Sequence, residues 1–310
     1  MEFNEKCFFL DSLNEPGSLL LIESLITTVI NLICSLIATA GNGIIIITFW
    51  RTKTLRRSPS HLLLLCLSFA DLITGIIVQP FHAAFKITHL LKYSSLSCVF
   101  RAIMETVSWF SATVSCSLLT LVVQERYFAL HFHLRYQALI TTKRVTIFLF
   151  LYVVSIGGFS ISRFALENIK PFIIISVAGL LAAFATLLIC YWKIYQLARH
   201  HHRQIRDQRT TTVSAQTGPH LKSLKKSVMN MAFVALLYMI AYLPFTCVLI
   251  AYLVCGFTRS VEAAYDITRT VAFMASAWDP FLYCWKMSDV KEAVVNVLKG
   301  RTNITAVEEL

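Results

Sequence analysis

The stretch Thr106–Tyr127, TVSWFSATVSCSLLTLVVQERY, decides the fold that we expect for this chain. Residues 106–124 contain no Asp, Glu, Lys or Arg, and a helical run of this length can cross the hydrocarbon core of a bilayer. Glu125 and Arg126 follow directly where the span ends. Because an arginine at the edge of a bilayer is costly unless it is paired, we expect these two residues to act together.

The same pattern recurs along the rest of the chain. Of its 310 residues, 56% are hydrophobic and 15% are charged, whereas about 25% are charged in ordinary soluble domains. The further uncharged or nearly uncharged runs are 24–50, 58–85, 145–162, 171–192, 227–258 and 270–285. Each run approaches or exceeds the length of a spanning helix. The sequence therefore predicts an all-α integral membrane protein, a bundle of seven transmembrane helices.

The distribution of Lys and Arg predicts how the bundle is oriented. Positive residues are retained in short cytoplasmic loops. If the N-terminus is outside, the inner segments carry about three times as many Lys and Arg residues as the outer ones. We therefore expect an extracellular N-terminus over 1–20, a membrane domain over 21–286 and a cytoplasmic segment over 287–310. The net charge of +11 then reflects this topology, and no nucleic-acid partner is expected.

The cytoplasmic segment is expected to contain a short amphipathic helix. In KMSDVKEAVVNVLKG, four apolar residues recur on one face at helical spacing, namely Val290, Val294, Val295 and Leu298. A helix of this kind lies on the membrane surface, so membrane lipid is the expected partner of this segment.

Three prolines and three cysteines occupy informative positions. Pro80, Pro244 and Pro280 lie within the predicted second, sixth and seventh spans, where each removes a backbone donor and is expected to kink its helix. The cysteines on the predicted outer side, where disulfides form, are Cys7, Cys98 and Cys255. Three candidates leave at least one unpaired, and the sequence does not choose the pair.

The chain contains no pattern typical of an enzyme active site. Neither an HExxH metal motif nor a nucleophile elbow is present, so no catalytic activity is expected. The chain is one domain without a detectable internal repeat, whereas many transporters are built from two related halves. A polytopic transporter or channel that uses Asp71 and Asp279 as an ion path stays open as the alternative function.

Five short motifs occur in order along the predicted spans. They are Gly41-Asn42-Gly43 in the first span, LSFADL with Asp71 in the second, Glu125-Arg126-Tyr127 in the third, AYLPF at 241–245 in the sixth and DPFLY at 279–283 in the seventh. Together they resemble the rhodopsin-like (class A) family of G-protein-coupled receptors, from residue 22 to residue 299. The resemblance implies a plasma-membrane receptor that binds an extracellular ligand and transmits the signal to a heterotrimeric G protein by rearranging its helices.

Two departures from the family pattern suggest a branch within it. The predicted outer segment SRFALENIKP, residues 162–171, contains no Cys, and Ala183 stands at about the place of the usual proline in the fifth helix. This combination resembles the melanocortin, lysophospholipid, cannabinoid and adenosine branch of the family.

The resemblance implies an activation switch for G-protein coupling. The matching residues are Glu125, Arg126, Tyr127, Tyr191, Tyr242, Pro244, Asp279, Pro280 and Tyr283. In the family, the arginine that matches Arg126 is held by its neighbouring acid at rest and turns toward the G protein on activation. Many members also brace it against an acid in the sixth helix, but Leu224 stands there, amid Lys222, Lys225 and Lys226. Ligand-independent signalling is therefore expected.

The two intramembrane acids are candidates for a cation site. In the family, the position of Asp71 joins Ser115, Ser276 and Asp279 around water and often a sodium ion, and hard oxygen ligands suit such a cation. The alternative is a pair of protonated acids that hydrogen-bond to neighbouring helices. No cofactor other than this sodium ion is expected.

The resemblance also places a ligand pocket among the outer halves of the helices. Its candidate lining residues are Phe81, His82, Glu105, Ser108, Tyr242, Phe245, Leu249 and Arg269. Ser108 stands where amine receptors carry an Asp, so a protonated amine lacks its usual partner. Glu105 and Arg269 could pair across the pocket, or a ligand with an anionic or carbonyl group could bind Arg269 while Glu105 receives a donor.

Overall fold

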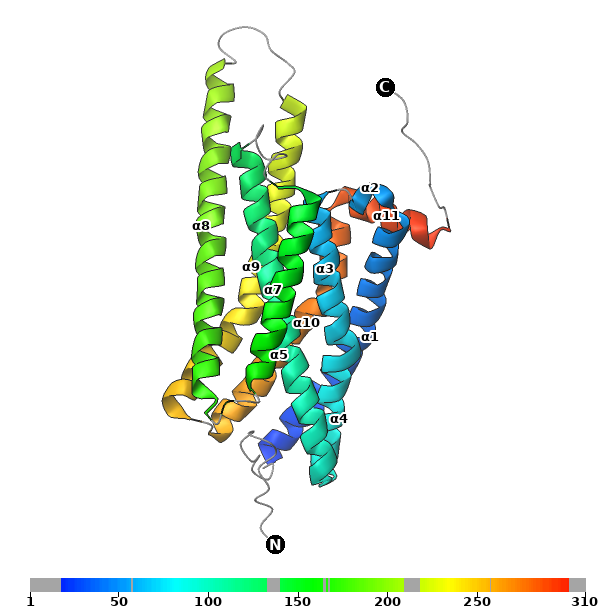
Figure 1. Cartoon of the computed structure of the whole chain (residues 1–310), viewed down its shortest axis with the longest axis vertical. Helices are drawn as coiled ribbons and strands as arrows, with labels where there is room; N and C mark the ends of the chain where they lie inside the picture. The colour runs from blue at the N-terminus through cyan, green and yellow to red at the C-terminus, as the bar shows by residue number, and fades with distance from the viewer. Residues whose placement is uncertain are drawn as a thin grey trace.

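The computed structural model describes residues 18–56, 58–132, 140–163, 166, 168–208, 218–256 and 258–300. Every regular element in these residues is a helix, and the long helices run side by side as one bundle (Figure 1). The second span consists of three consecutive elements, α3 (Pro59–Ile73), η1 (Thr74–Val78) and α4 (Gln79–Leu90). The other spans are single helices: α1 (Ser18–Arg51), α5 (Ser94–Phe132), α7 (Thr142–Ser162), α8 (Lys170–Gln208), α9 (Gly218–Cys255) and α10 (Arg259–Lys286). The predicted seven-helix bundle is confirmed.

Six of the spans within the described residues are long and apolar enough to cross a membrane. The seventh, α10, is more polar because it carries Glu262, Asp266, Arg269 and Asp279, all of them buried. Intramembrane charges of this kind face the interior of a bundle rather than lipid. Its polarity therefore marks α10 as the helix along which polar contacts gather.

Figure 1 shows α1 beginning at one end of the bundle and α11 (Ser288–Leu298) lying across the other. We call these the N end and the C end. The short α2 (Lys53–Arg56) also lies at the C end. The predicted surface helix is thus present as α11. Of its four apolar residues, Val290 and Val294 are buried against the bundle, whereas Val295 and Leu298 are 37% and 65% exposed.

Helix α5 is the centre of the bundle. It packs against α3, α4, α7, α8 and α9. Its uncharged stretch, from which the fold was predicted, contributes Leu118, Leu119 and Val122 to the largest core cluster. A helix that contacts this many neighbours is apolar on most sides, which explains why residues 106–124 contain no charge.

Helix α1 approaches its neighbours closely at two glycines. A Cβ on Gly41 would lie 2.9 Å from Cγ of Pro280, and a Cβ on Gly75 of η1 would lie 3.0 Å from the backbone nitrogen of Thr39. Ser35 Oγ donates a 2.7 Å hydrogen bond to the carbonyl oxygen of Gly75. Small residues let helices approach and hydrogen-bond in a membrane, where burial of apolar surface does not drive association.

The predicted prolines occupy two settings. Pro244 lies inside α9 and Pro280 inside α10, whereas Pro80 lies in the first turn of α4, which follows the π-helical turn η1. Single π turns and prolines are the usual causes of bends in helices. The second span therefore changes its helical geometry between Ile73 and Gln79.

The structure shows whether two of the three outer cysteines form a disulfide bond. Cys98 is disulfide-bonded, and its partner lies outside the described residues. Cys255 is exposed and free, so it is not part of a disulfide. The third candidate, Cys7, lies outside the described residues.

The two neighbouring glycines of α1 should respond oppositely to a methyl group. In Gly41→Ala, the new Cβ meets the ring of Pro280, which cannot rotate away, so we expect a loss of about 1–3 kcal/mol of stability. A Cβ on Gly43 meets nothing within 4 Å, so Gly43→Ala should be neutral or stabilise by up to about 1 kcal/mol. Thermal unfolding in detergent measures both, and equal midpoints for the two variants would contradict the close approach of α1 and α10.

Candidate functional site

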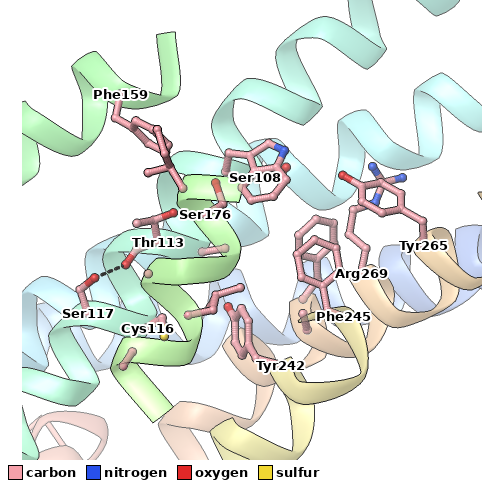
Figure 2. Close-up of a pocket in the computed structure, with 18 of the residues that line it drawn as sticks. Ser108, Thr113, Cys116, Ser117, Phe159, Ser176, Tyr242, Phe245, Tyr265 and Arg269 are labelled. Carbon is pink, nitrogen blue, oxygen red and sulfur yellow. Dashed lines mark hydrogen bonds between the residues drawn. The ribbon is translucent and has the colours of Figure 1, made fainter. Parts of the chain in front are cut away.

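A cavity of about 270 Å³ lies between five of the spans, in the half of the bundle toward the N end. Its walls come from α5, α7, α8, α9 and α10 (Figure 2). Six residues of α5 line it, at positions 108, 109, 112, 113, 116 and 117. This spacing of three to four residues places all six on one face of the helix.

Aromatic rings form most of the cavity wall. The aromatic lining residues are Trp109, Tyr152, Phe159, Tyr242, Phe245, Tyr265 and Phe273. The indole of Trp109 lies 5.9 Å from the ring of Phe245, and Phe245 lies 5.5 Å from Tyr265. Aromatic pairs at these distances support one another beyond the area that they bury. The wall is therefore a packed set of rings.

Small hydroxyls and one charge provide the polar part of the cavity. The hydroxyl residues are Ser108, Thr113, Ser117 and Ser176, and the charged residue is Arg269. Ser108, Ser117 and Ser176 donate their protons to carbonyl oxygens of their own helices, at 2.7 to 2.9 Å. Their oxygens are therefore left as acceptors. Figure 2 shows the bond from Ser117 to Thr113, with Arg269 and Tyr265 on the opposite side of the cavity from Phe159.

Arg269 belongs to a network of buried charges that continues from the cavity toward the N end. Glu105 is its centre: Oε1 accepts from Nη1 of Arg269 at 2.5 Å, and Oε2 accepts from Nη1 of Arg163 at 3.0 Å and from the hydroxyl of Tyr265 at 3.2 Å. All three charged side chains are less than 8% exposed. Three donors therefore occupy both oxygens of Glu105.

The network continues through Asp266 to helix α1. Asp266 pairs with Nη2 of Arg269 on one side and with Nζ of Lys86 on the other. Lys86 also lies 3.8 Å from Oε2 of Glu23. Three acids and three bases from α1, α4, α5, α10 and the end of α7 thus form one set. We call Glu23, Lys86, Glu105, Arg163, Asp266 and Arg269 the ionic network.

The structure divides the eight predicted pocket residues into two groups. Four line the cavity, namely Ser108, Tyr242, Phe245 and Arg269. The other four do not. Glu105 lies in the ionic network, Leu249 is buried in the cluster around Trp109, Phe81 packs edge-on to Phe100, and His82 is fully buried with no hydrogen-bond partner among the described residues. The pairing of Glu105 with Arg269, one of the two alternatives left open, is present.

Several residues of this region did not emerge from the sequence. Trp109 and Tyr265 line the cavity, and Arg163 binds Glu105, although the sequence placed Arg163 in an outer loop. The helical spacing from Ser108 would have found Ala112 and Cys116, because they lie four and eight residues further along the same face of α5. No local signal would have found Arg163, because its partner lies 58 positions away in the chain.

The predicted cation site is brought together at the middle of the bundle. Asp71 Oδ1 accepts from Ser276 Oγ at 2.8 Å and from Ser115 Oγ at 3.3 Å, and Asp279 lies beside Asp71. Oδ2 of Asp71 and Oδ2 of Asp279 are buried without a hydrogen-bond partner among the described residues. Two carboxylates and two hydroxyls form an oxygen donor set that suits a hard cation. The same arrangement is equally consistent with carboxyl groups that are protonated.

The predicted switch residues are spread along the bundle toward the C end. Glu125 Oε2 accepts a 2.7 Å hydrogen bond from Ser60 Oγ of α3, and the ring of Tyr127 lies 5.6 Å from Nζ of Lys193. The hydroxyl of Tyr191 is buried and has no hydrogen-bond partner among the described residues, whereas the hydroxyl of Tyr283 lies beside the carboxyl group of Asp279. The side chains of Arg126 and Leu224 lie outside the described residues.

Tyr242 connects the cavity to this region. Its ring stacks on that of Tyr238 one turn away, with centroids 4.9 Å apart and planes at 17°. Both tyrosines belong to the core cluster that contains Tyr283 of α10. A displacement of Tyr242 from the cavity side must therefore move either Tyr238 or the backbone of α9 near Pro244.

Comparison with known proteins identifies the type of chain that carries this arrangement. The family profile described as "7 transmembrane receptor (rhodopsin family)" matches residues 41–172 and 161–283. The histamine H2 receptor of Cavia porcellus is 26% identical over 86% of this chain and 77% of its own length. The 5-hydroxytryptamine receptor 4 of Cavia porcellus is 21% identical over 85% and 76%, and the cannabinoid receptor type 1B of Takifugu rubripes is 22% identical over 83% and 59%.

The ionic network should make Glu105 sensitive even to an isosteric change. In Glu105→Gln the guanidinium of Arg163 loses the charge of its acidic partner and Arg269 keeps one of its two acidic partners, so we expect a loss of about 3 kcal/mol of stability. Thermal unfolding of the purified protein in lipid nanodiscs measures this change. Glu292→Gln, at an exposed position of α11, is the control and should keep the wild-type midpoint. A midpoint that is unchanged in Glu105→Gln would show that the network contributes nothing to stability.

Proposed function

Because this chain belongs to the rhodopsin family of seven-transmembrane receptors and is a G-protein-coupled receptor, we propose that the cavity between α5, α7, α8, α9 and α10 is its ligand site. The single observation that carries this proposal is the contact of one cavity with five helices, including the proline-containing α9 and α10. A ligand there touches the helices that must rearrange. Pockets of this kind, mostly apolar with a few polar groups, are the usual form of small-molecule sites.

The receptor resides in the plasma membrane with its N end outside. The excess of Lys and Arg in the segments at the C end supports this orientation. It places the ionic network at the extracellular end and Glu125, Arg126 and Tyr127 at the cytoplasmic end, where a heterotrimeric G protein binds. The names of the relatives refer to amines in two cases and to cannabinoids in a third, so they do not agree on one ligand class.

The signal passes from the cavity along α9. A ligand that displaces Tyr242 or Phe245 acts within three residues of Pro244, where the helix lacks one backbone hydrogen bond. The part of α9 toward the C end then moves relative to α10, which brings the hydroxyls of Tyr191 and Tyr283 within reach of Arg126. The unpaired state of the Tyr191 hydroxyl supports this step, because buried polar groups persist only where another state or water satisfies them.

The acids at the centre hold a sodium ion in the resting state. The two orphaned carboxylate oxygens, on Asp71 and Asp279, support the proposal, and Ser115 and Ser276 would complete an oxygen donor set. Such an ion would draw α3, α5 and α10 together. It stabilises the resting state only if it binds that state better than the active one.

Ligand-independent signalling should fall when α9 gains an acid at the position of the missing brace. We expect Leu224→Glu to lower nucleotide exchange on the G protein that couples best in a panel of purified heterotrimers, because the new carboxylate holds Arg126 in its resting position. Ser223→Glu adds the same charge about 100° around the helix and should leave the exchange rate unchanged. Equal rates for wild type and Leu224→Glu, at equal amounts of folded receptor, would contradict the switch.

Sodium should stabilise the receptor through Asp71. We expect sodium chloride to raise the unfolding midpoint and to lower ligand-independent exchange relative to the same concentration of potassium chloride, and Asp71→Asn to lose both effects. Asp289→Asn, which removes an exposed carboxylate from α11, should keep them. A sodium effect that survives in Asp71→Asn would place the ion elsewhere, and no effect in the wild type would favour protonated acids.

A further inference from the structure

The ionic network leaves the ligand cavity without an available charge. Among the described lining residues, Arg269 is the one formally charged side chain, and no carboxylate is present. Nη1 of Arg269 binds Glu105 and Nη2 binds Asp266, so both of its terminal nitrogens are engaged by acids. Its Nε is buried and has no hydrogen-bond partner among the described residues. The cavity therefore borders a guanidinium whose charge is balanced by two acids and which keeps N–H groups to donate, among them that of Nε.

A charged ligand would find no counterion in this cavity. Glu105, which lies three residues before Ser108 on α5, already accepts from Arg163, Arg269 and Tyr265. An anionic ligand would have to displace Glu105 or Asp266 from Arg269 and leave a buried carboxylate unpaired. Burying a charge without a partner costs far more than burying a neutral polar group. The charge state of the network thus selects an uncharged ligand.

The remaining lining indicates the shape and polarity of that ligand. Rings of Trp109, Phe245 and Tyr265 favour a flat aromatic body, since offset and edge-to-face contacts add to apolar burial. The remaining N–H groups of Arg269, that of Nε among them, require an acceptor, such as a carbonyl oxygen. The serine oxygens, whose protons are already donated within their helices, accept from an N–H or O–H group.

The cavity is open on the side between α7 and α8. Helix α7 packs against α5 and α3, and α8 packs against α5 and α9, whereas α7 and α8 meet through the stacked rings of Phe159 and Phe172, whose centroids are 4.7 Å apart. Two lining residues of α8 on this side are exposed, Gly179 and Ile175, the latter at 58%. Both helices lie within the apolar spans. This opening therefore faces the hydrocarbon layer of the membrane.

We infer that the cavity binds an uncharged aromatic molecule that bears a carbonyl or amide group and enters from the lipid layer between α7 and α8. The signalling effect of this ligand rests on the proposed receptor function, but its binding can be measured without a G protein. An uncharged ligand of this kind partitions into the bilayer, whereas ammonium and carboxylate forms stay in water or at the headgroups. The pairing of charges beside the cavity and the entry from the lipid layer thus both favour an uncharged ligand.

Three probes that share a ring system test the charge selection. Naphthylacetamide is neutral, naphthylacetate is an anion and naphthylethylamine is a cation at neutral pH. Apparent affinities follow from the rise of the unfolding midpoint of purified receptor in phosphatidylcholine nanodiscs with free probe concentration, up to about 1 mM. We expect the amide to bind at least tenfold more tightly than either charged probe.

Two glycine variants test the place of binding. A Cβ on Gly179 meets nothing within 4 Å, so Gly179→Trp adds a side chain at the proposed opening without a clash at Cβ. Gly158→Trp adds the same ring to an exposed position of α7 that does not line the cavity and also has open space. We expect Gly179→Trp to weaken amide binding at least tenfold and Gly158→Trp to keep it. Gly179→Leu replaces the tryptophan variant if that variant unfolds at a lower temperature than wild type.

The outcomes separate the parts of the inference. Binding of the acetate or the ethylamine as tight as that of the amide would overturn the charge selection. Unchanged amide binding in the Gly179 variant would overturn the opening between α7 and α8, and no stabilisation by any probe would overturn both. Failure of the proposed receptor function would appear differently, as amide binding that does not change nucleotide exchange on any G protein.

Discussion

Charges inside an apolar helix bundle must neutralise one another, and the N end of this receptor is organised by that requirement. Glu105 on α5 cannot stay buried unless the guanidinium groups of Arg163 and Arg269 reach it. Arg269 in turn pairs with Asp266, and Asp266 pairs with Lys86. The positions of α1, α4, α5, α10 and the end of α7 follow from this one set of pairs. A buried ion pair need not add net stability over apolar packing, but it specifies which helices meet.

The chemistry of the cavity is a consequence of the same set. No acid is among the described residues that line the cavity, and Glu105 and Asp266 beside it are paired in the network, so the proposed ligand site has aromatic residues, serine acceptors and unused N–H groups on Arg269. The cavity also borders α9 at Tyr242, which stacks on Tyr238 toward the C end. Ligand recognition and signal transmission therefore share one helix, and a rigid packed wall passes displacement on rather than absorbing it.

Close packing along α1 and α10 explains a second group of sequence features. Gly41 touches Pro280, and Asn42 Nδ2 donates 2.9 Å to the carbonyl oxygen of Ser276. The same backbone region of α10 presents Ser276 Oγ to Asp71. The short motifs of the first, second and seventh spans are thus one contact surface. These motifs lie together because the backbone carbonyl oxygens and buried acids of one helix need hydrogen-bond donors from a neighbouring helix.

The sequence by itself determined the seven spans, the surface helix α11 and the depth of the acids Asp71 and Asp279. These follow from local hydropathy and from the length of a helix that crosses a bilayer, which need no knowledge of neighbours. The sequence also identified four residues that line the cavity, Ser108, Tyr242, Phe245 and Arg269. Their distances along the helices from the family motifs are fixed by the sequence. Only the tertiary structure decided that Glu105, Leu249, Phe81 and His82 lie outside the cavity wall, that Arg163 binds Glu105, and that α7 and α8 leave an opening. Those features depend on how each helix is rotated and which helix stands beside it, and rotation is set by contacts between residues that are far apart in the chain.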